Sequence, residues 1–355
     1  MGSLIYMHIK TLFILLLFFL CVPVFINAQT ELNDSIHVSD VSNIKDSLNI
    51  NNLSSDSNGY FVPVSQFTWA GERRYTISGD QPRLGTQIKP LTTVIIGGVT
   101  LTSMVILHVA QQNAWWRGER RSFHFQEDWV SALQVDKCGH SFGGYMMSYG
   151  MDEALMTSGV DYNSSALFGS IFGVAYQSYV EFEDGFAKDW GFSPSDWYFD
   201  FIGPAFYLAQ HYVPALQNIT PKWQYIPTEW TTKANINRPK TFIDDYNSTT
   251  FWYSVNLYNS LPDNLKKYWL PWLNIAVGYG ADSDVKSDPN HPDLQNIRRF
   301  IIGLDYNLVK LLPEGGAFWN WCRQTLNYAK LPSPAIEFSK GVTRFYLMYP
   351  FLHSF

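Results

Sequence analysis

Three consecutive apolar segments between residues 127 and 212 each carry a pair of polar side chains at helical spacing, and this pattern constrains the fold most. The pairs are Asp136 and His140, Glu181 and Asp184, and Asp196 and Asp200. Residues three or four apart share one face of a helix. Carboxylates in apolar surroundings must be paired, protonated or bound to a cation. We therefore expect three packed helices that turn these side chains toward one centre.

Local signals place the helices at about residues 127–157, 164–186 and 194–212. Ser193 is the expected N-cap of the third helix, with Pro194 at its first position and Asp196 at the capping-box position. Gly143 and Gly144 continue the His140 face and permit close approach of a neighbouring helix. The capping residues thus predict where the third helix begins, and the two glycines predict tight packing between helices at the centre.

The N-terminal region is not expected to join the folded body. Residues 1–28 contain the apolar run "TLFILLLFFLCVPVF" and end at Ala28, which is typical of a signal peptide cut near Gln29. The alternative is an uncleaved membrane anchor. Residues 29–60 are rich in Ser, Asn and Asp and predict a disordered polar leader. The chain is therefore interpreted as exported to the cell envelope.

Composition indicates contact with a membrane. Charged residues make up 16% and aromatic residues 17% of the chain, against roughly 25% charged residues in an ordinary soluble domain. No charged residue occurs from Leu91 to Trp116, a stretch long enough to cross a bilayer. A buried core helix is the alternative for this stretch. The net charge of -6 and the lack of a basic stripe exclude nucleic acid as a partner.

The sequence pattern changes after Pro214 from helical spacing to strand-like runs. The runs "TTFWYSVNLY", "WLNIAVGYGA", "RRFIIGLDYNLV" and "TRFYLMYPF" predict strands, the second and third as antiparallel neighbours across a polar loop. We expect a mainly α fold: a membrane-associated bundle of about four helices over residues 61–215, with an irregular and β-rich C-terminal extension over residues 216–355.

Residues 139–143, "GHSFG", match the G-x-S-x-G nucleophile elbow of α/β-hydrolases, with Ser141 as the nucleophile. Such an elbow needs a buried strand directly before it, but Asp136 and Lys137 stand at that point. We expect Ser141 to lie within a helix, and a serine esterase remains an alternative function.

The three motifs together resemble a known family. "DKCGH", "QSYVEFEDGF" and "WGFSPSDWYFDFIG" are similar to the D-K-x-x-H, E-x-x-D and G-x-S-x-x-D-x-x-x-N/D-x-x-G order of the YfiM-like predicted periplasmic lipoproteins, which distantly resemble VanZ-type membrane proteins. Asp200 stands where VanZ-like proteins have Asn, so this cluster is more acidic. The lipoprotein cysteine is missing, since Leu20 precedes Cys21 where a small residue is required. The resemblance implies a helical bundle in the envelope and supplies no established reaction.

Two main functions follow from the cluster. In the first, it acts on an envelope lipid or lipid-linked glycan, with His140 as acid or base and a divalent cation (zinc, manganese or magnesium) held by carboxylates. In the second, it is a polar lock that fixes helix packing in a structural or binding protein. The candidate catalytic residues are Asp136, Lys137, His140, Asp184, Asp196 and Asp200. The candidate cation ligands are His140, Glu181, Asp184 and Asp196.

Overall fold

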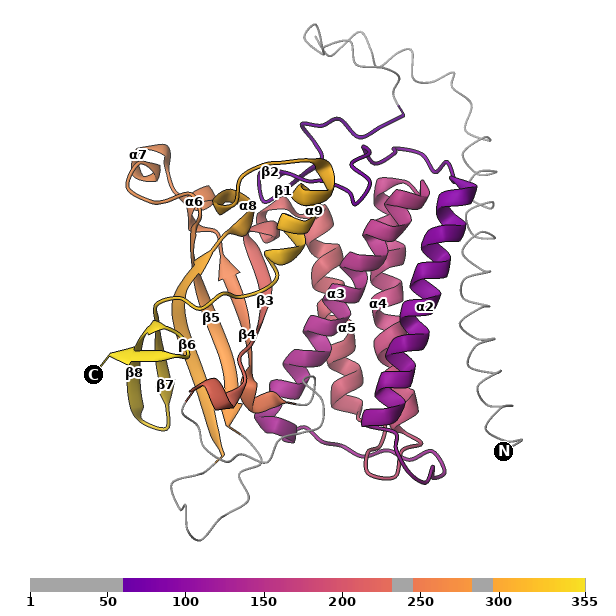
Figure 1. Ribbon diagram of the computed structural model, residues 1–355, viewed down its shortest axis with the longest axis vertical. Helices are drawn as coiled ribbons and strands as arrows, with labels where there is room; N and C mark the ends of the chain where they lie inside the picture. The colour runs from indigo at the N-terminus through magenta and orange to yellow at the C-terminus, as the bar shows by residue number, and fades with distance from the viewer. Residues whose placement is uncertain (1–59, 232–244, 283–295, 355) are drawn as a thin grey trace, which may run out of the picture.

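The computed structural model describes residues 60–231, 245–282 and 296–354 (Figure 1). The predicted signal peptide and nearly all of the polar leader lie outside the described residues. So does most of the polar loop predicted between the second and third strand-like runs.

Four long helices lie side by side on one side of the described protein (Figure 1). They are α2 (Pro90–Ala114), α3 (Val135–Ser158), α4 (Tyr162–Asp184) and α5 (Pro194–Tyr212). Helix α3 begins later than expected, because a short 3-10 helix over Ser131–Gln134 precedes it. The backbone there has positive φ angles at Ala132, Leu133 and Gln134, which a right-handed helix does not accommodate.

Local capping sets where α4 and α5 begin. The Ser193 hydroxyl accepts a hydrogen bond from the backbone N–H of Asp196, and Pro194 occupies the first helical position. This confirms the predicted start of α5. The Asp161 carboxylate caps α4 by accepting from the backbone N–H of Ser164. Both caps satisfy backbone donors that have no partner inside the helix.

Glycines bring the three acid-bearing helices close together. A Cβ at Gly203 of α5 would collide with the carbonyl of Ser141 on α3. A Cβ at Gly173 of α4 would meet the carbonyl of Gly144 on α3 at 2.6 Å. Gly144 also faces the Pro204 ring of α5, as expected of a glycine at a helix contact. The short polar side chains between these helices can therefore reach one another.

Helix α2 lies at the outer edge of the bundle (Figure 1). Among the described residues it is the one helix long and apolar enough to cross a membrane, with a mean hydropathy of 1.9 and only 6% of that window buried. It packs on α4 through Met104, which contacts Phe172 and Tyr176 in one buried cluster. The buried-core alternative for this stretch is therefore wrong, because a core helix is covered on most sides.

The C-terminal half forms an antiparallel sheet of seven strands in chain order, β3 to β9. Its strands are β3 (Ile219–Tyr225), β4 (Thr249–Val255), β5 (Leu273–Asp282), β6 (Ile297–Tyr306), β7 (Ala335–Ser339), β8 (Val342–Met348) and β9 (Leu352–Ser354). Strands β5 and β6 pair with Val277 opposite Ile302. The predicted pairing of these two runs is confirmed.

Shorter elements complete the described fold. Two-residue strands precede the bundle and short helices connect the long strands: β1 (Thr68–Trp69), β2 (Glu72–Arg73), α6 (Leu257–Ser260), α7 (Asp263–Lys266), α8 (Leu308–Leu311) and α9 (Ala317–Leu326). Arg74, which follows β2, forms buried ion pairs with Asp152 and Glu153 of α3 at 2.8 and 2.6 Å. The segment before the bundle is thereby fastened to its core.

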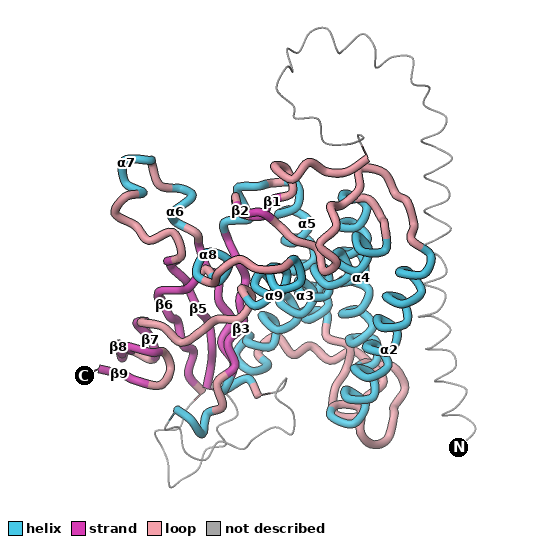
Figure 2. The backbone as a smooth tube through the Cα atoms, turned by 45° about the horizontal axis from the view of Figure 1, so that its top comes forward, coloured by secondary structure: helices cyan, strands magenta, loops and turns pink. Residues whose placement is uncertain are grey.

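The expectation of a mainly α fold is wrong. Of the described residues, 48% are helical and 22% lie in strands, and Figure 2 shows the long helices α2 to α5 and the strands of the large sheet on separate sides of the protein. The prediction failed because the strand-like runs were taken for an appendage. They form a continuous sheet with its own core, in which Trp252 packs against Ala276, Ile301 and Tyr349.

The sheet packs on the bundle through its aromatic face. The ring of Phe251 on β4 lies 5.8 Å from that of Phe142 on α3, and Tyr253 lies 6.1 Å from Phe206 on α5. The opposite face of the sheet carries the Trp252 cluster together with buried polar side chains, and Lys222 and Asp305 form an ion pair there at 2.7 Å. The aromatic side chains of β4 therefore pack on α3 and α5, the two helices that carry most of the acidic cluster.

Candidate functional site

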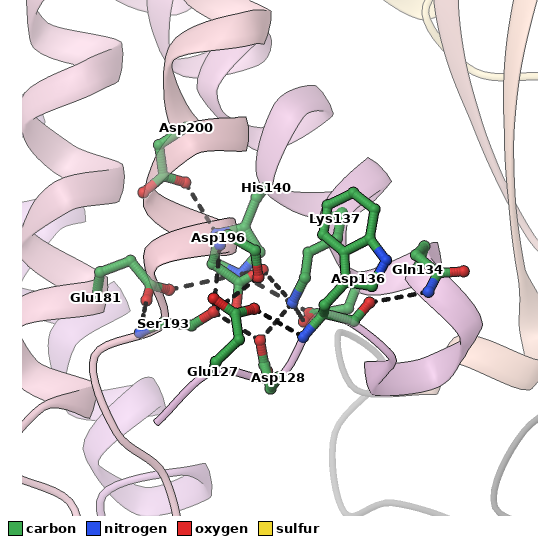
Figure 3. A network of polar contacts seen from close by, with 12 residues as sticks. Glu127, Asp128, Gln134, Asp136, Lys137, His140, Glu181, Ser193, Asp196 and Asp200 are labelled. Atoms are coloured by element: carbon green, nitrogen blue, oxygen red, sulfur yellow. Dashed lines mark hydrogen bonds and ion pairs between the residues drawn. The ribbon is translucent and has the colours of Figure 1, made fainter. Parts of the chain in front are cut away.

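The His140 imidazole lies at the centre of the polar cluster (Figure 3). Its Nδ1 lies 2.9 Å from Oδ1 of Asp200 on α5. Because a carboxylate only accepts hydrogen bonds, Nδ1 donates and the ring orientation is fixed. The opposite nitrogen, Nε2, faces carboxylate oxygens of Asp136, Glu181 and Asp196 at 3.7, 3.6 and 3.7 Å. His140 on α3 thus contacts carboxylates from all three helices, α3, α4 and α5.

Lys137 holds the second half of the cluster. Its ammonium lies 2.5 Å from Asp128, 2.6 Å from Asp196 and 3.2 Å from Asp136. The side chain is only 1% exposed, so these ion pairs are made away from bulk water. Asp196 is shared between the lysine and the histidine, and it joins the two halves.

The turn before α5 ties the acids to the backbone. The Ser193 hydroxyl donates to Oδ1 of Asp128 at 2.6 Å, and the Ser193 backbone N–H donates to Oε2 of Glu181 at 3.1 Å. Capping of α5 and positioning of the cluster are therefore done by the same residue. Asp196 does not complete a capping box with its carboxylate, because the Ser193 backbone N–H donates to Glu181 and the Asp196 carboxylate pairs with Lys137 and His140.

Negative charge dominates this cluster. Six carboxylates surround one lysine and one histidine: Asp128, Asp136, Glu181, Asp184, Asp196 and Asp200. Even with His140 protonated, the acids exceed the bases by four, and repulsion between them is strong where water is scarce. Protons or a bound cation must supply the remaining positive charge.

Asp128 lies on the loop before α3, outside the helices. Burial alone would raise the pKa of its carboxyl group, but hydrogen bonds from Lys137 and Ser193 outweigh burial and lower that pKa below its ordinary value. Asp128 is therefore ionised at neutral pH and is a fixed negative charge at the entrance of the cluster.

Two groups of side chains have ligand atoms close enough for one ion. Among the described residues they are Asp136, His140 and Asp196, and His140, Glu181 and Asp200, with the ligand atoms of each group within 4.8 Å of one another. Oδ2 of Asp200 is buried and has no hydrogen-bond partner among the described residues. The unpaired oxygen of Asp200 is thus a second observation, besides the excess of acids, that favours a bound cation at this position.

Asp184 was expected to be a cation ligand, but it lies beside the potential ligands and not among them. Its Oδ1 accepts a hydrogen bond from the Trp116 indole at 2.5 Å, and it belongs to neither group of potential ligands. It lines the same cavity as His140 and Glu181. The structure therefore places it in the wall beside the centre.

The cluster lines part of a cavity of about 310 Å³. Most of the other lining side chains are aromatic or aliphatic and come from α2 and its C-cap, from α3 and α4, from the loop before α5, and from β3 and β4: Leu107, Trp115, Phe142, Met147, Tyr176, Val180, Trp190, Trp223 and Phe251. Gln111, Gln126 and Gln177 also line it. The cavity thus combines an acidic cluster with largely apolar walls. The sheet supplies one wall, so the C-terminal half is part of the site.

Two residues of the site escaped the sequence reasoning. Asp128 precedes Lys137 by nine residues in irregular chain, where no helical period marks it. Tyr246 lies just before β4, and its hydroxyl donates to Oδ1 of Asp136 at 2.5 Å across 110 residues of sequence. The acidic character of the segment around Asp128 was a signal; nothing in the sequence singled out Tyr246.

Ser141 lies inside α3, as predicted, and is buried. The residues directly before it are helical, because a 3-10 helix over Ser131–Gln134 leads into α3 at Val135. The strained strand-to-helix turn of a nucleophile elbow is therefore absent at this position, and the esterase interpretation loses its basis.

Residues 124–211 match the family described as predicted periplasmic lipoprotein (DUF2279). The match covers about a quarter of the chain, from the loop before α3 to the end of α5, and includes the whole His140 cluster. No curated protein and no solved structure matches the chain. The similarity supports the resemblance at the level of an uncharacterised family of periplasmic lipoproteins and leaves the YfiM-like and VanZ-like relationships as predictions. It confirms the predicted export to the cell envelope.

Proposed function

We propose that this envelope protein uses the His140 cluster to hold a divalent cation, and that the cation binds the anionic head group of an envelope lipid or lipid-linked glycan. The observation that carries the proposal is the position of His140. Its Nδ1 is anchored to Asp200, while its Nε2 points at three carboxylate oxygens 3.6–3.7 Å away.

This arrangement suits a cation for two reasons. Atoms that bind one ion at about 2.0–2.2 Å lie roughly 3–3.5 Å from one another. The three carboxylate oxygens lie 3.6–3.7 Å from Nε2 of His140, which is only slightly farther. Histidines that bind metals commonly donate their other N–H to a carboxylate, as His140 does to Asp200. Oxygen ligands with one imidazole suit zinc, manganese or magnesium.

The cavity supports an amphipathic ligand. Its apolar walls suit acyl or prenyl chains, whereas its acidic cluster would repel a phosphate or carboxylate head group. A cation held between His140 and the acids would reverse that repulsion, so the head group and the ion are expected to bind together. A bound cation also polarises an oxygen of the head group, which supports hydrolysis or transfer at that group.

The proposal is tested by the metal content of the full-length protein purified in detergent, followed by titration with zinc, manganese and magnesium after treatment with a chelator. His140→Ala is expected to abolish cation binding. Glu183→Gln is the matched control, because Glu183 lies on α4 two residues from Glu181 but pairs with Arg120. Equal cation binding by the wild type and His140→Ala would overturn the proposal.

The polar lock is the second candidate, and the Lys137 network favours it. Lys137 joins the loop before α3 and helix α5 through Asp128 and Asp196 without any ligand. If this is the only function, the wild type binds no cation, and His140→Ala lowers the thermal stability without changing any binding property. The two measurements on one variant therefore separate the candidates.

A further inference from the structure

The exposed surface of the helices is apolar while their charges are buried. Helix α5 shows this most clearly: Asp196 and Asp200 are 3% and 0% exposed. The side chains that it turns outward are Trp197, Tyr198, Phe201, Ile202 and Tyr212. Soluble helices have the reverse arrangement, with charged residues outside.

The sheet has the same inverted polarity. Apolar side chains on one face of β5 to β8 are between 42% and 55% exposed: Val277, Phe300, Ile302, Phe338 and Phe345. The opposite face of β5 to β7 buries polar and charged side chains: Asn274, Arg299, Asp305 and Glu337. Apolar-out and polar-in alternation is the pattern of strands that face lipid, whereas a sheet with one face in water puts its polar residues outside.

A polar interior completes this pattern. Residues of β3, β4, β6, β7 and β8 line one polar cavity of about 240 Å³, so the sheet curls around it. Arg299 and Glu337 lie in that lining. The charged groups of the sheet are therefore enclosed by the protein, and the outward face keeps its aromatic and aliphatic side chains.

The lengths of α2, β5 and β6 match a bilayer, whereas β7 and β8 are shorter, with five and seven residues. Strands β5 and β6 have ten residues each and α2 has 25. Crossing about 30 Å of hydrocarbon takes roughly 9–11 residues in a tilted strand and about 20 in a helix. Each of β5 to β8 also has a hydrogen-bonded strand on both sides, which lipid requires because it offers the backbone no partners.

We propose that the outward face of β5 to β8 contacts membrane hydrocarbon, so that the sheet is embedded in the same bilayer as α2. Two arguments favour lipid over a protein partner. Helix α2 and strands β5 to β8 lie on opposite sides of the described protein (Figure 1), so exposed apolar side chains occur on both sides of it. The sheet face is also continuous with the Phe251 and Tyr253 contacts on the bundle, so lipid covers only what the helices leave open.

The test uses spin labels on the full-length protein, with its cysteines replaced by serine, in phosphatidylcholine vesicles. Labels are placed at Val277→Cys and Ile302→Cys, the cross-strand pair on β5 and β6. Ile106→Cys on α2 is the reference for lipid and Tyr268→Cys, 77% exposed beyond α7, is the reference for water. The accessibility of each label to oxygen, which concentrates in lipid, is compared with that to a water-soluble nickel complex.

Oxygen access well above nickel access at both strand positions, as at Ile106, is the expected result. Nickel access as high as at Tyr268 would place the sheet in water and overturn the proposal. Low access to both reagents would show that protein covers the face, in a second copy or a partner, and would also overturn it. A thermal unfolding midpoint close to that of the wild type in detergent reports that each labelled protein is folded, and this readout depends neither on where the sheet lies nor on cation binding.

Discussion

The imidazole of His140 and the carboxylate of Asp200 form a hydrogen bond of 2.9 Å between α3 and α5. Asp200 is fully buried, so this bond is made without competition from water. It leaves Nε2 of His140 facing Asp136, Glu181 and Asp196, which come from α3, α4 and α5. Gly203, one turn after Asp200 on α5, lets the helices approach closely enough for the bond to form.

Replacing Asp200 by Asn should weaken cation binding without unfolding the protein. The amide keeps the size of the side chain, but it is neutral and no longer favours one orientation of the His140 ring. Loss of such a supporting carboxylate typically costs about 10–100-fold in metal affinity. Calorimetric titration of the variant beside Glu183→Gln measures the change, and an unchanged affinity would contradict the positioning role.

Replacing Lys137 by Met should destabilise the protein. The lysine is buried with ion pairs to Asp128, Asp136 and Asp196, and its loss leaves carboxylates without a partner. Breaking a buried ion pair on one side costs about 3–5 kcal/mol. Denaturant unfolding in detergent measures the free energy. A cation added in excess should recover part of the loss, and no destabilisation at all would argue against the ion-pair network.

Replacing Tyr246 by Phe should loosen the sheet from the bundle. The Tyr246 hydroxyl donates to Asp136, and a hydrogen bond to a charged group contributes about 1.5–3 kcal/mol. Tyr258→Phe is the control, since the Tyr258 ring stacks under Lys310 at 4.8 Å and keeps that contact without its hydroxyl. Equal unfolding free energies for the two variants would mean that the bond to Asp136 contributes nothing.

Adding one methyl group to α5 should disturb helix packing more than adding one to α3. Gly203→Ala places a Cβ against the Ser141 carbonyl, whereas Gly150 on α3 has open space around it. Overpacking costs about 1–3 kcal/mol, while an exposed Gly→Ala in a helix stabilises by about 0.4–1 kcal/mol. Thermal unfolding of both variants should therefore shift in opposite directions; a shared direction would refute the close contact.

Ser141→Ala should leave cation binding nearly unchanged and lower the stability by only about 0.5–1.5 kcal/mol, the contribution of the hydrogen bond between its hydroxyl and Tyr253. The serine lies within α3 and is not at an elbow, so a fluorophosphonate probe for active serines should not label it. Mass spectrometry of the probe-treated wild type is the measurement. A labelled Ser141 peptide would restore the hydrolase interpretation.

The sequence by itself determined much of the helical half and of the cluster. Helical spacing and the Ser193-Pro194 cap depend on neighbours in the chain, so α5 could be placed at Pro194–Tyr212 before any tertiary contact was known. The same spacing picked out His140 and most of its acids, because a carboxylate on an apolar helix face has few alternatives to a shared polar centre. The polar loop between the two strand-like runs of β5 and β6 likewise predicted their pairing.

Tertiary structure alone decided the rest. Whether α2 is a core helix or faces outward depends on what packs against it, and its own composition allows both. Tyr246 reaches Asp136 only because β4 docks on α3, which no local pattern encodes. The sheet was mistaken for an extension because strand residues alternate in the same way whether the apolar face meets a bundle, a membrane or a partner. Which partner a face meets is set by contacts between distant segments, and such contacts leave no period in the sequence.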